Sequence, residues 1–154
     1  MAGDDNAPAL PVPARRLRFE LRQLALVAAG AVPGALLRWQ SGVQIGPLLG
    51  SSAAADLLVN GVGSFLLGCL AGPIPRRTGL LLLLGIGFCG SLTTFSSWLL
   101  DVIRLLQHQR PWSAAGLIAV SLLLGVGSAW LGLLLSRGLH RWRHRRPGPR
   151  LPLR

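Results

Sequence analysis

The stretch from Thr78 to Leu100 carries no charged residue and reads TGLLLLLGIGFCGSLTTFSSWLL. Its 23 residues exceed the roughly 20 apolar residues that cross a bilayer as an α-helix. Two further charge-free intervals, 57–75 and 111–136, are about as long or longer. A shorter one covers 23–37, so the first membrane helix must carry Arg38 within or near the membrane. The pattern predicts an all-α membrane protein with four transmembrane helices, near residues 21–42, 51–72, 78–106 and 112–137.

The composition supports this class and excludes others. Of 154 residues, 51% are hydrophobic and only 14% are charged, and the mean hydropathy is +0.50. A soluble domain of this length cannot bury so much apolar surface in one core. Every acid lies in a tail or at the edge of an apolar run, so acid–base catalysis has almost no candidates and we expect no enzyme. The positive charge flanks apolar stretches and does not alternate with aromatics, which favours membrane lipids over nucleic acid as its partner.

The sixteen basic residues are all arginines, and their distribution predicts the topology. With four spans, thirteen of them fall on the side of both termini and the second loop, and three fall on the other side. Arginine-rich loops and tails stay in the cytoplasm. We therefore expect a multi-pass protein of the inner (plasma) membrane with both termini cytoplasmic. The expected organisation is a disordered basic tail over 1–20, a transmembrane domain over 21–137 and a basic tail over 138–154.

The third apolar stretch contains signals against a regular helix. Three glycines at 85, 87 and 90 precede five hydroxyl residues between Ser91 and Ser97. Such hydroxyls compete for backbone hydrogen bonds. A helix broken here would expose carbonyls that are tolerated only if they face protein, water or an ion. Unwound carbonyls bind Na⁺ well, but a continuous, glycine-kinked helix with hydroxyls bonded to i−4 carbonyls explains the composition equally well.

Several groups at membrane depth suit an anion. Asn60 is a carboxamide in an apolar span and needs a partner or a substrate. Ser121 offers a further donor in the fourth span. Phe95 and Trp98 lie three residues apart on one helical face, where their ring edges carry positive charge. Ordinary packing against lipid or core remains the alternative for both rings.

At this point the chain resembles a known family, the fluoride channels called Fluc or CrcB. The resemblance rests on one segment in each predicted helix, in the same order and spacing: GAVPGALLRW (30–39), VNGVGSFLLG (59–68), GFCGSLTTFSSW (87–98) and SLLLGVGSAWLG (121–132). It covers roughly residues 30–132. The combination of the second and third segments is far more specific than either alone.

The resemblance implies an antiparallel dimer of four-helix subunits with two fluoride pores. It also implies a structural Na⁺ at the dimer interface, held by main-chain carbonyls of Gly90 and Thr93 in the broken third helices. By the same resemblance Asn60 donates to fluoride, Phe95 belongs to a box of phenylalanines, and Ser121 belongs to a polar track. Arg38 matches an arginine at the aqueous vestibule. The hydroxyl of Thr94 completes the set of groups that replace fluoride's hydration shell.

Two features depart from the family pattern. The second position of the aromatic box is Trp98, whose indole N–H is a better donor than a C–H but whose bulk narrows a pore. Leu117 stands where the family often has tyrosine, and the chain has no tyrosine at all. The arginine bias also argues against insertion in both orientations. The partner is therefore either a second copy or an oppositely oriented paralogue.

Two other functions fit the size of the chain. A small multidrug transporter is also a four-helix dimer, but cation or proton exchange needs an intramembrane carboxylate. We expect none here, because Asp56 and Asp101 are placed near helix ends. A noncatalytic membrane assembly protein would need only the glycine rows and the basic tail.

Overall fold

The computed structural model describes residues 14–72 and 78–145. Within these ranges the chain is helical and contains no strand. Four helical segments are long and apolar enough to cross a membrane: Arg16–Leu48, Ser52–Leu70, Thr78–Gln107 and Pro111–Trp142. The predictions of an all-α protein and of four membrane-spanning helices are confirmed.

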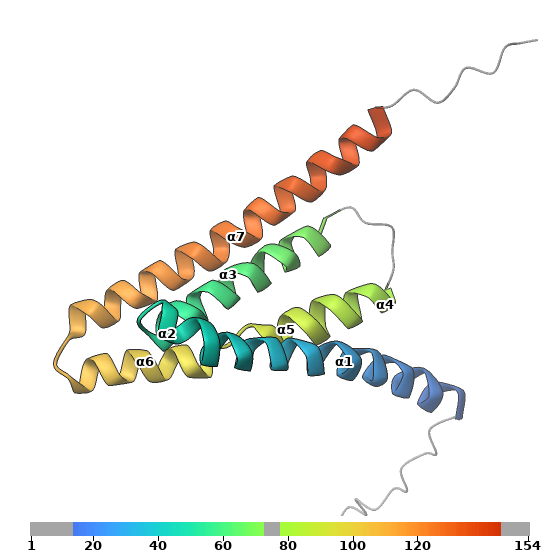
Figure 1. Ribbon diagram of the computed structural model, residues 1–154. Helices are drawn as coiled ribbons and strands as arrows, with labels where there is room; N and C mark the ends of the chain where they lie inside the picture. Colours follow the sequence, from blue (N-terminus) through green and yellow to red (C-terminus); the bar gives the residue numbers. More distant parts are fainter. Residues whose placement is uncertain (1–13, 73–77, 146–154) are drawn as a thin grey trace, which may run out of the picture.

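The helices follow one another in chain order (Figure 1). The first span consists of α1 (Ala14–Gln40), the π-helical turn η1 (Ser41–Ile45) and α2 (Gly46–Leu48). The second span is α3 (Ser52–Leu70). The third consists of α4 (Thr78–Leu80), the π-helical η2 (Leu81–Cys89), α5 (Gly90–Leu92) and α6 (Ser96–Gln107). The fourth is α7 (Pro111–Arg145).

The outer ends of the first and last helices lie beyond their predicted limits. Helix α1 begins at Ala14 instead of near residue 21, and α7 continues to Arg145 instead of ending near 137. No proline interrupts the sequence between Pro13 and Pro33 or between Pro111 and Pro147, and arginine is a good helix former. The pair Arg16–Glu20, with Nε to Oε1 at 3.2 Å, adds i,i+4 support. Residues 14–20 and 138–145 are thus helical, and the rest of both predicted tails lies outside the described residues.

Close backbone contacts at glycines hold the helices together. The main contacts join α3 to α7 and α1 to η2, with α6 also against α7. A Cβ atom on Gly68 would collide with the carbonyl of Ala129, and one on Gly132 with the carbonyl of Phe65. A Cβ on Gly87 would meet the carbonyl of Val27 at 2.5 Å. Small residues permit this approach where no hydrophobic effect drives helices together.

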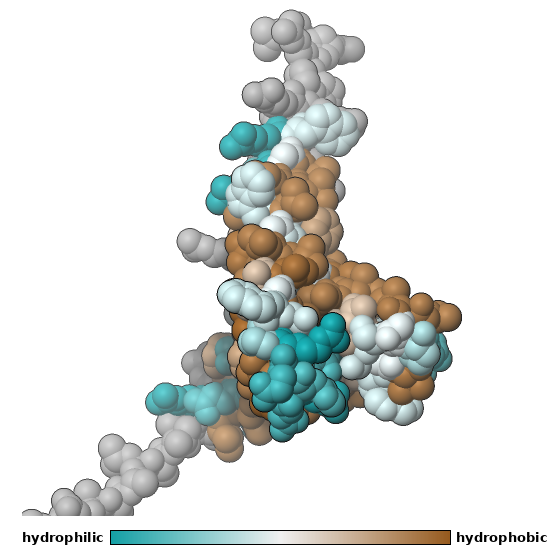
Figure 2. Space-filling model, turned by 90° about the vertical axis from the view of Figure 1, so that its left-hand side faces the viewer, coloured by the Kyte–Doolittle hydropathy of each residue, from teal (hydrophilic) through white to brown (hydrophobic). Residues whose placement is uncertain are grey.

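The bundle has two distinct ends. Figure 1 shows the start of α1, the start of α4 and the end of α7 at one end, and α2 and the α6–α7 turn at the other. Figure 2 looks at this second end, where hydrophilic residues face the viewer and apolar surface covers much of the flanks behind. In the most apolar 18-residue stretch of each span, only 11% of the residues of the first span and 6% of those of the fourth are buried within the subunit. Their apolar flanks therefore require lipid or another subunit.

Candidate functional site

The third span contains a short non-helical segment between α5 and α6. Helix α5 ends at Leu92, Thr93 is extended with φ −73° and ψ 149°, and α6 resumes at Ser96. Backbone groups exposed by such a segment need partners at membrane depth. The segment therefore identifies the place where side chains from other helices must supply hydrogen bonds.

Asn60 of α3 supplies two of these bonds. Its Nδ2 donates to the carbonyl of Thr94 at 2.9 Å, and the backbone N–H of Thr94 donates to its Oδ1 at 2.7 Å. The carboxamide of Asn60 thus takes the place of the two backbone groups that would bond the N–H and the C=O of Thr94 in a continuous helix. An amide nitrogen carries two hydrogens, so one donor of Asn60 remains after the bond to Thr94. The sequence predicted a partner or a substrate for Asn60, and the structure identifies Thr94 as the partner.

Thr94 continues this polar group into α6. Its side chain is buried, at 7% exposed, and Oγ1 lies 3.2 Å from Oγ of Ser97. Oγ1 also accepts the N–H of Ser97 at 3.4 Å, which satisfies a donor in the first turn of α6. Asn60, Thr94 and Ser97 therefore form one continuous hydrogen-bonded group across the non-helical segment.

The hydroxyls on the N-terminal side of the segment bond back to the helix. Ser91 donates to the carbonyls of Gly87 and of Ala31 in α1, both at 2.8 Å. Thr93 Oγ1 donates to the carbonyl of Cys89 at 3.0 Å. These are the i−4 bonds expected for a kinked, continuous helix. In this segment, side-chain bonds to i−4 carbonyls occur up to Thr93. Beyond it, Asn60 supplies the hydrogen-bond partner of the Thr94 backbone.

Gly90 and Thr93 present backbone oxygens that fit a hard cation. Gly90 is exposed, and the nearest atom to a Cβ built there is the carbonyl oxygen of Gly85 at 3.9 Å. Its carbonyl accepts only a long bond from Thr93 Oγ1, at 3.4 Å. Neutral carbonyl oxygens are suitable ligands for Na⁺. Two from one subunit are too few to enclose the ion, so this face fits a site shared with a second chain.

Phe95 and Trp98 touch but occupy different environments. Their ring centroids lie 5.2 Å apart with planes tilted by 46°. Phe95 is 69% exposed, whereas Trp98 is 8% exposed and packs with Val102 and Ala114. Leu117 packs against this same cluster. The buried Nε1–H of Trp98 has no hydrogen-bond partner among the described residues.

Ser121 is not hydrogen-bonded to the bonded group among the described residues, and Arg38 lines a cavity that Ser97 also lines. Ser121 donates to the carbonyl of Leu117 at 2.7 Å, and no hydrogen bond joins it to Asn60 or Thr94 within the described parts of the chain. Its hydroxyl must turn away from Leu117 before it can donate to an anion. Arg38 is half-buried and lines a polar cavity of about 420 Å³ with residues of α3 and α6.

Asp56 lies near the start of a helix, as the sequence predicted, but it is buried inside the subunit. Asp56 belongs to the second span, is only 8% exposed and lines the same cavity as Arg38. It follows Ser52, the first residue of α3, by just over one turn, which made it look terminal in the sequence. The tertiary fold buries it because η1 and α6 pack against α3. One feature of the sequence could have indicated its burial. Asp56 lies four residues before Asn60, and residues i and i+4 share a helical face.

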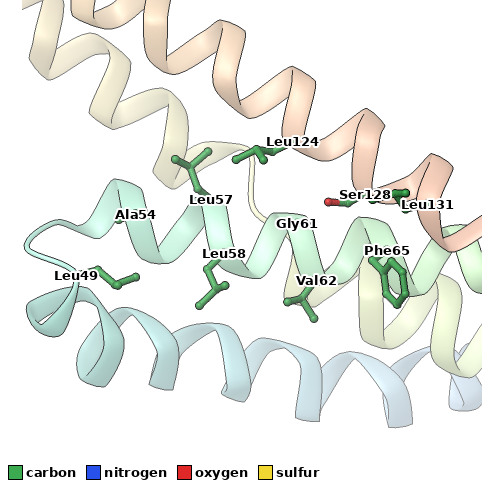
Figure 3. Close-up of a pocket in the computed structure, with 10 residues that line it drawn as sticks. All are labelled: Leu49, Ala54, Leu57, Leu58, Gly61, Val62, Phe65, Leu124, Ser128 and Leu131. Atoms are coloured by element: carbon green, nitrogen blue, oxygen red, sulfur yellow. The ribbon is translucent and has the colours of Figure 1, made fainter.

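The larger cavity is apolar and lies elsewhere. It has a volume of about 520 Å³ between α3 and α7, and its walls include Leu58, Val62 and Phe65 opposite Leu124 and Leu131 (Figure 3). The hydroxyl of Ser128 is the polar side-chain group that Figure 3 shows there. With no charged side chain in its lining, this cavity suits a hydrocarbon or apolar side chain and does not suit an anion.

Comparisons with known proteins converge on one family. A family model described as CrcB-like protein, Camphor Resistance (CrcB), matches residues 25–133. The fluoride-specific ion channel FluC 2 of Synechococcus sp. (strain CC9902) is 52% identical over 127 residues, which cover 81% of this chain and 87% of that protein. The fluoride-specific ion channel FluC of Haemophilus ducreyi is 36% identical over 117 residues (76% and 94%), and that of Pseudomonas paraeruginosa is 38% identical over 125 residues (79% and 95%).

Proposed function

The chain belongs to the CrcB family of fluoride channels, and from this membership we propose that it is a fluoride-selective channel subunit through which cytoplasmic fluoride leaves the cell. The flow follows the gradient and needs no other energy source. Hydrogen fluoride crosses bilayers as a neutral acid and ionises inside, so a path for the anion protects the cell from fluoride. The family consists of channels and not of enzymes.

The observation that carries this proposal is the pair of hydrogen bonds between Asn60 and Thr94 at the non-helical segment. Fluoride is small and strongly hydrated, so a selective path must replace its water with closely spaced donors and exclude larger anions. The remaining Nδ2 hydrogen of Asn60 is fixed at this segment, and the hydroxyl of Thr94, which donates to Ser97 Oγ at 3.2 Å, can turn from there toward an anion. A path built on such donors discriminates by size and geometry.

Aromatic and hydroxyl groups complete the proposed path. The exposed ring of Phe95 can direct its positive edge toward an anion. The unpartnered Nε1–H of Trp98 is a stronger donor, and a buried donor without a partner calls for a ligand or water. Ser121 joins the path when its hydroxyl leaves the Leu117 carbonyl. Arg38 attracts anions into the polar cavity by its charge.

We propose further that two subunits form an antiparallel dimer with two pores and one structural Na⁺. The sparsely buried first and fourth spans support a second subunit. The carbonyls of Gly90 and Thr93 would hold the ion together with the same pair from the partner. The ion would supply positive charge that fixes two non-helical segments against each other; it takes no part in fluoride transfer.

Fluoride efflux from liposomes tests the function. Vesicles loaded with fluoride or with chloride and containing the full-length chain should release fluoride at least about 100-fold faster than chloride, since a larger anion cannot match the fixed donors. The buried Asp56 also suits a small multidrug transporter, so uptake of a quaternary ammonium cation is the second measurement. Cation transport without fluoride release would show that the protein is a small multidrug transporter. If neither ion is transported, the protein would be a noncatalytic membrane assembly protein.

The arginine bias leads to a prediction about partners. Arg38, Arg104 and Arg110 belong to the end that carries α2, against thirteen arginines assigned to the other end, so most copies should insert with both termini in the cytoplasm. C-terminal reporter fusions, one active in the cytoplasm and one outside it, should therefore give signal from the cytoplasmic side only. Expressed alone, such a chain should give little fluoride resistance, and an oppositely oriented paralogue should restore it.

The control for this prediction changes the bias itself. Replacing Arg137 and Arg141 by Gln and adding arginines beside Arg110 should produce signal from both compartments. Equal signal from both compartments with the unchanged chain would contradict single insertion and would establish a homodimer of oppositely inserted copies.

A further inference from the structure

A polar cavity lies at the α2 end of the bundle, separate from the apolar cavity of Figure 3. Its volume is about 420 Å³, and it receives side chains from α1, α3 and α6. The polar side chains that line it are Arg38, Ser52, Asp56, Ser96 and Ser97. Ser97 is bonded to Thr94, and Thr94 to Asn60, so hydrogen-bonding groups run without a gap from this cavity to the non-helical segment.

Asp56 is the unusual member of this lining. Its side chain is more than nine-tenths buried, and Oδ2 has no hydrogen-bond partner among the described residues. It precedes Asn60 by four residues on the same face of α3. A path that leads an anion to Asn60 therefore passes a buried carboxyl group with one free oxygen.

The charges around Asp56 determine which form of this group suits an anion. Arg38 of α1 is the cation of the lining. Asp101 of α6 lies on the other side of Ser52, whose Oγ donates to it at 3.3 Å, and Asp101 is in turn paired with Arg104 at 3.0 Å. An ionised, unpartnered carboxylate would be costly to bury here and would repel fluoride. A neutral carboxylic acid instead offers an O–H donor.

We propose that Asp56 holds a proton on Oδ2 and that this O–H, which has no partner among the described residues and almost no surface open to the cavity, turns to donate a hydrogen bond to a fluoride ion there, beside Arg38. This inference rests on the proposed fluoride channel. No covalent bond forms or breaks, because the ion binds the acid and leaves again. Loss of the proton removes the donor and adds a negative charge to the path. Fluoride flux therefore falls as the pH rises, and Asp56 makes the channel most active in acid, where fluoride loading is greatest.

The test compares fluoride release from liposomes across a pH series, with protein-free vesicles subtracting the leak of hydrogen fluoride. For the unchanged chain, flux should fall about fivefold or more from the acid end to the alkaline end of the series. Asp56→Asn keeps a donor and cannot ionise, so its flux should stay within about twofold over the series. Asp56→Leu removes the donor and should be slow at every pH. Asp101→Asn should retain the pH dependence of the unchanged chain.

A second readout does not need transport. The infrared carbonyl band of a protonated carboxylic acid should be present in the full-length protein, be absent in Asp56→Asn, and shift when fluoride but not chloride is added. No band, or a band that fluoride leaves unmoved, would overturn the proposal whatever the flux. Flux that does not depend on pH, or pH dependence that persists in Asp56→Asn, would also overturn it but leave the fluoride channel standing. A band that fluoride shifts, without any fluoride flux, would support the site and overturn the channel.

Discussion

Asn60→Asp abolishes fluoride efflux while the protein still assembles: this is the expected result in liposomes. The change replaces Nδ2, which donates to the Thr94 carbonyl at 2.9 Å, with a carboxyl oxygen that has no hydrogen when ionised and only one, in place of two, when protonated. It also removes the second Nδ2 hydrogen of Asn60, which we propose donates to fluoride. An unmade bond to a charged group costs about 3 kcal/mol, which corresponds to about 100-fold in rate, and the new negative charge lowers the flux further.

The matched control is Gln107→Glu, which makes the same change from amide to acid at the exposed end of α6. It should keep flux within about threefold, because an exposed charge is screened by water and salt. Both variants should elute from size exclusion like the unchanged chain and show the same helical circular dichroism. An Asn60→Asp protein that passes these checks and still conducts would remove Asn60 from the pathway.

The membrane fold could be predicted because it depends on a property that the sequence displays directly. Charge-free intervals of bilayer length identify helices whatever they pack against. The ends of the helices were harder to predict from the sequence, since nothing in the pattern at Ala14 or Arg145 indicates how far a helix continues beyond the membrane. Small residues four apart, such as Gly30 and Gly34, predicted tight helix packing of the kind seen between α3 and α7 and between α1 and η2.

The candidate site could be predicted only in part from the sequence, because it depends on which side chains of different helices contact one another. The composition around Thr93 favoured an interruption and a kink equally, and the pairing of Asn60 with Thr94 joins residues 34 apart in the sequence. The burial of Asp56 comes from two neighbouring helices and could not be judged from one. Trp98 and Leu117 were recognised as separate departures, and only the structure shows that both belong to one cluster with Val102 and Ala114.

The proposed sodium site makes Gly90→Val the second decisive experiment. A Cβ atom at Gly90 would lie 3.9 Å from the nearest other atom, the carbonyl oxygen of Gly85, and the position is exposed, so the fold of one chain should tolerate valine. In a dimer whose third spans meet at this face, the same side chain would separate the carbonyls that hold the ion. We expect Gly90→Val to retain helical content but to be monomeric in bilayers, as counted by single-molecule photobleaching.

Two further variants separate a lost interface from a lost fold. Gly87→Val should unfold or misinsert the subunit, because its Cβ would lie 2.5 Å from the carbonyl oxygen of Val27. Thr93→Ser keeps the hydroxyl that bonds the Cys89 carbonyl at 3.0 Å, so its dimer should resist dilution within about threefold of the unchanged protein. If the ion is structural, exchange of Na⁺ for a large organic cation should weaken the unchanged dimer and leave Gly90→Val unaffected. A Gly90→Val dimer as stable as the original would exclude these carbonyls from the interface, because no valine side chain can share the space in which two such segments and an ion meet.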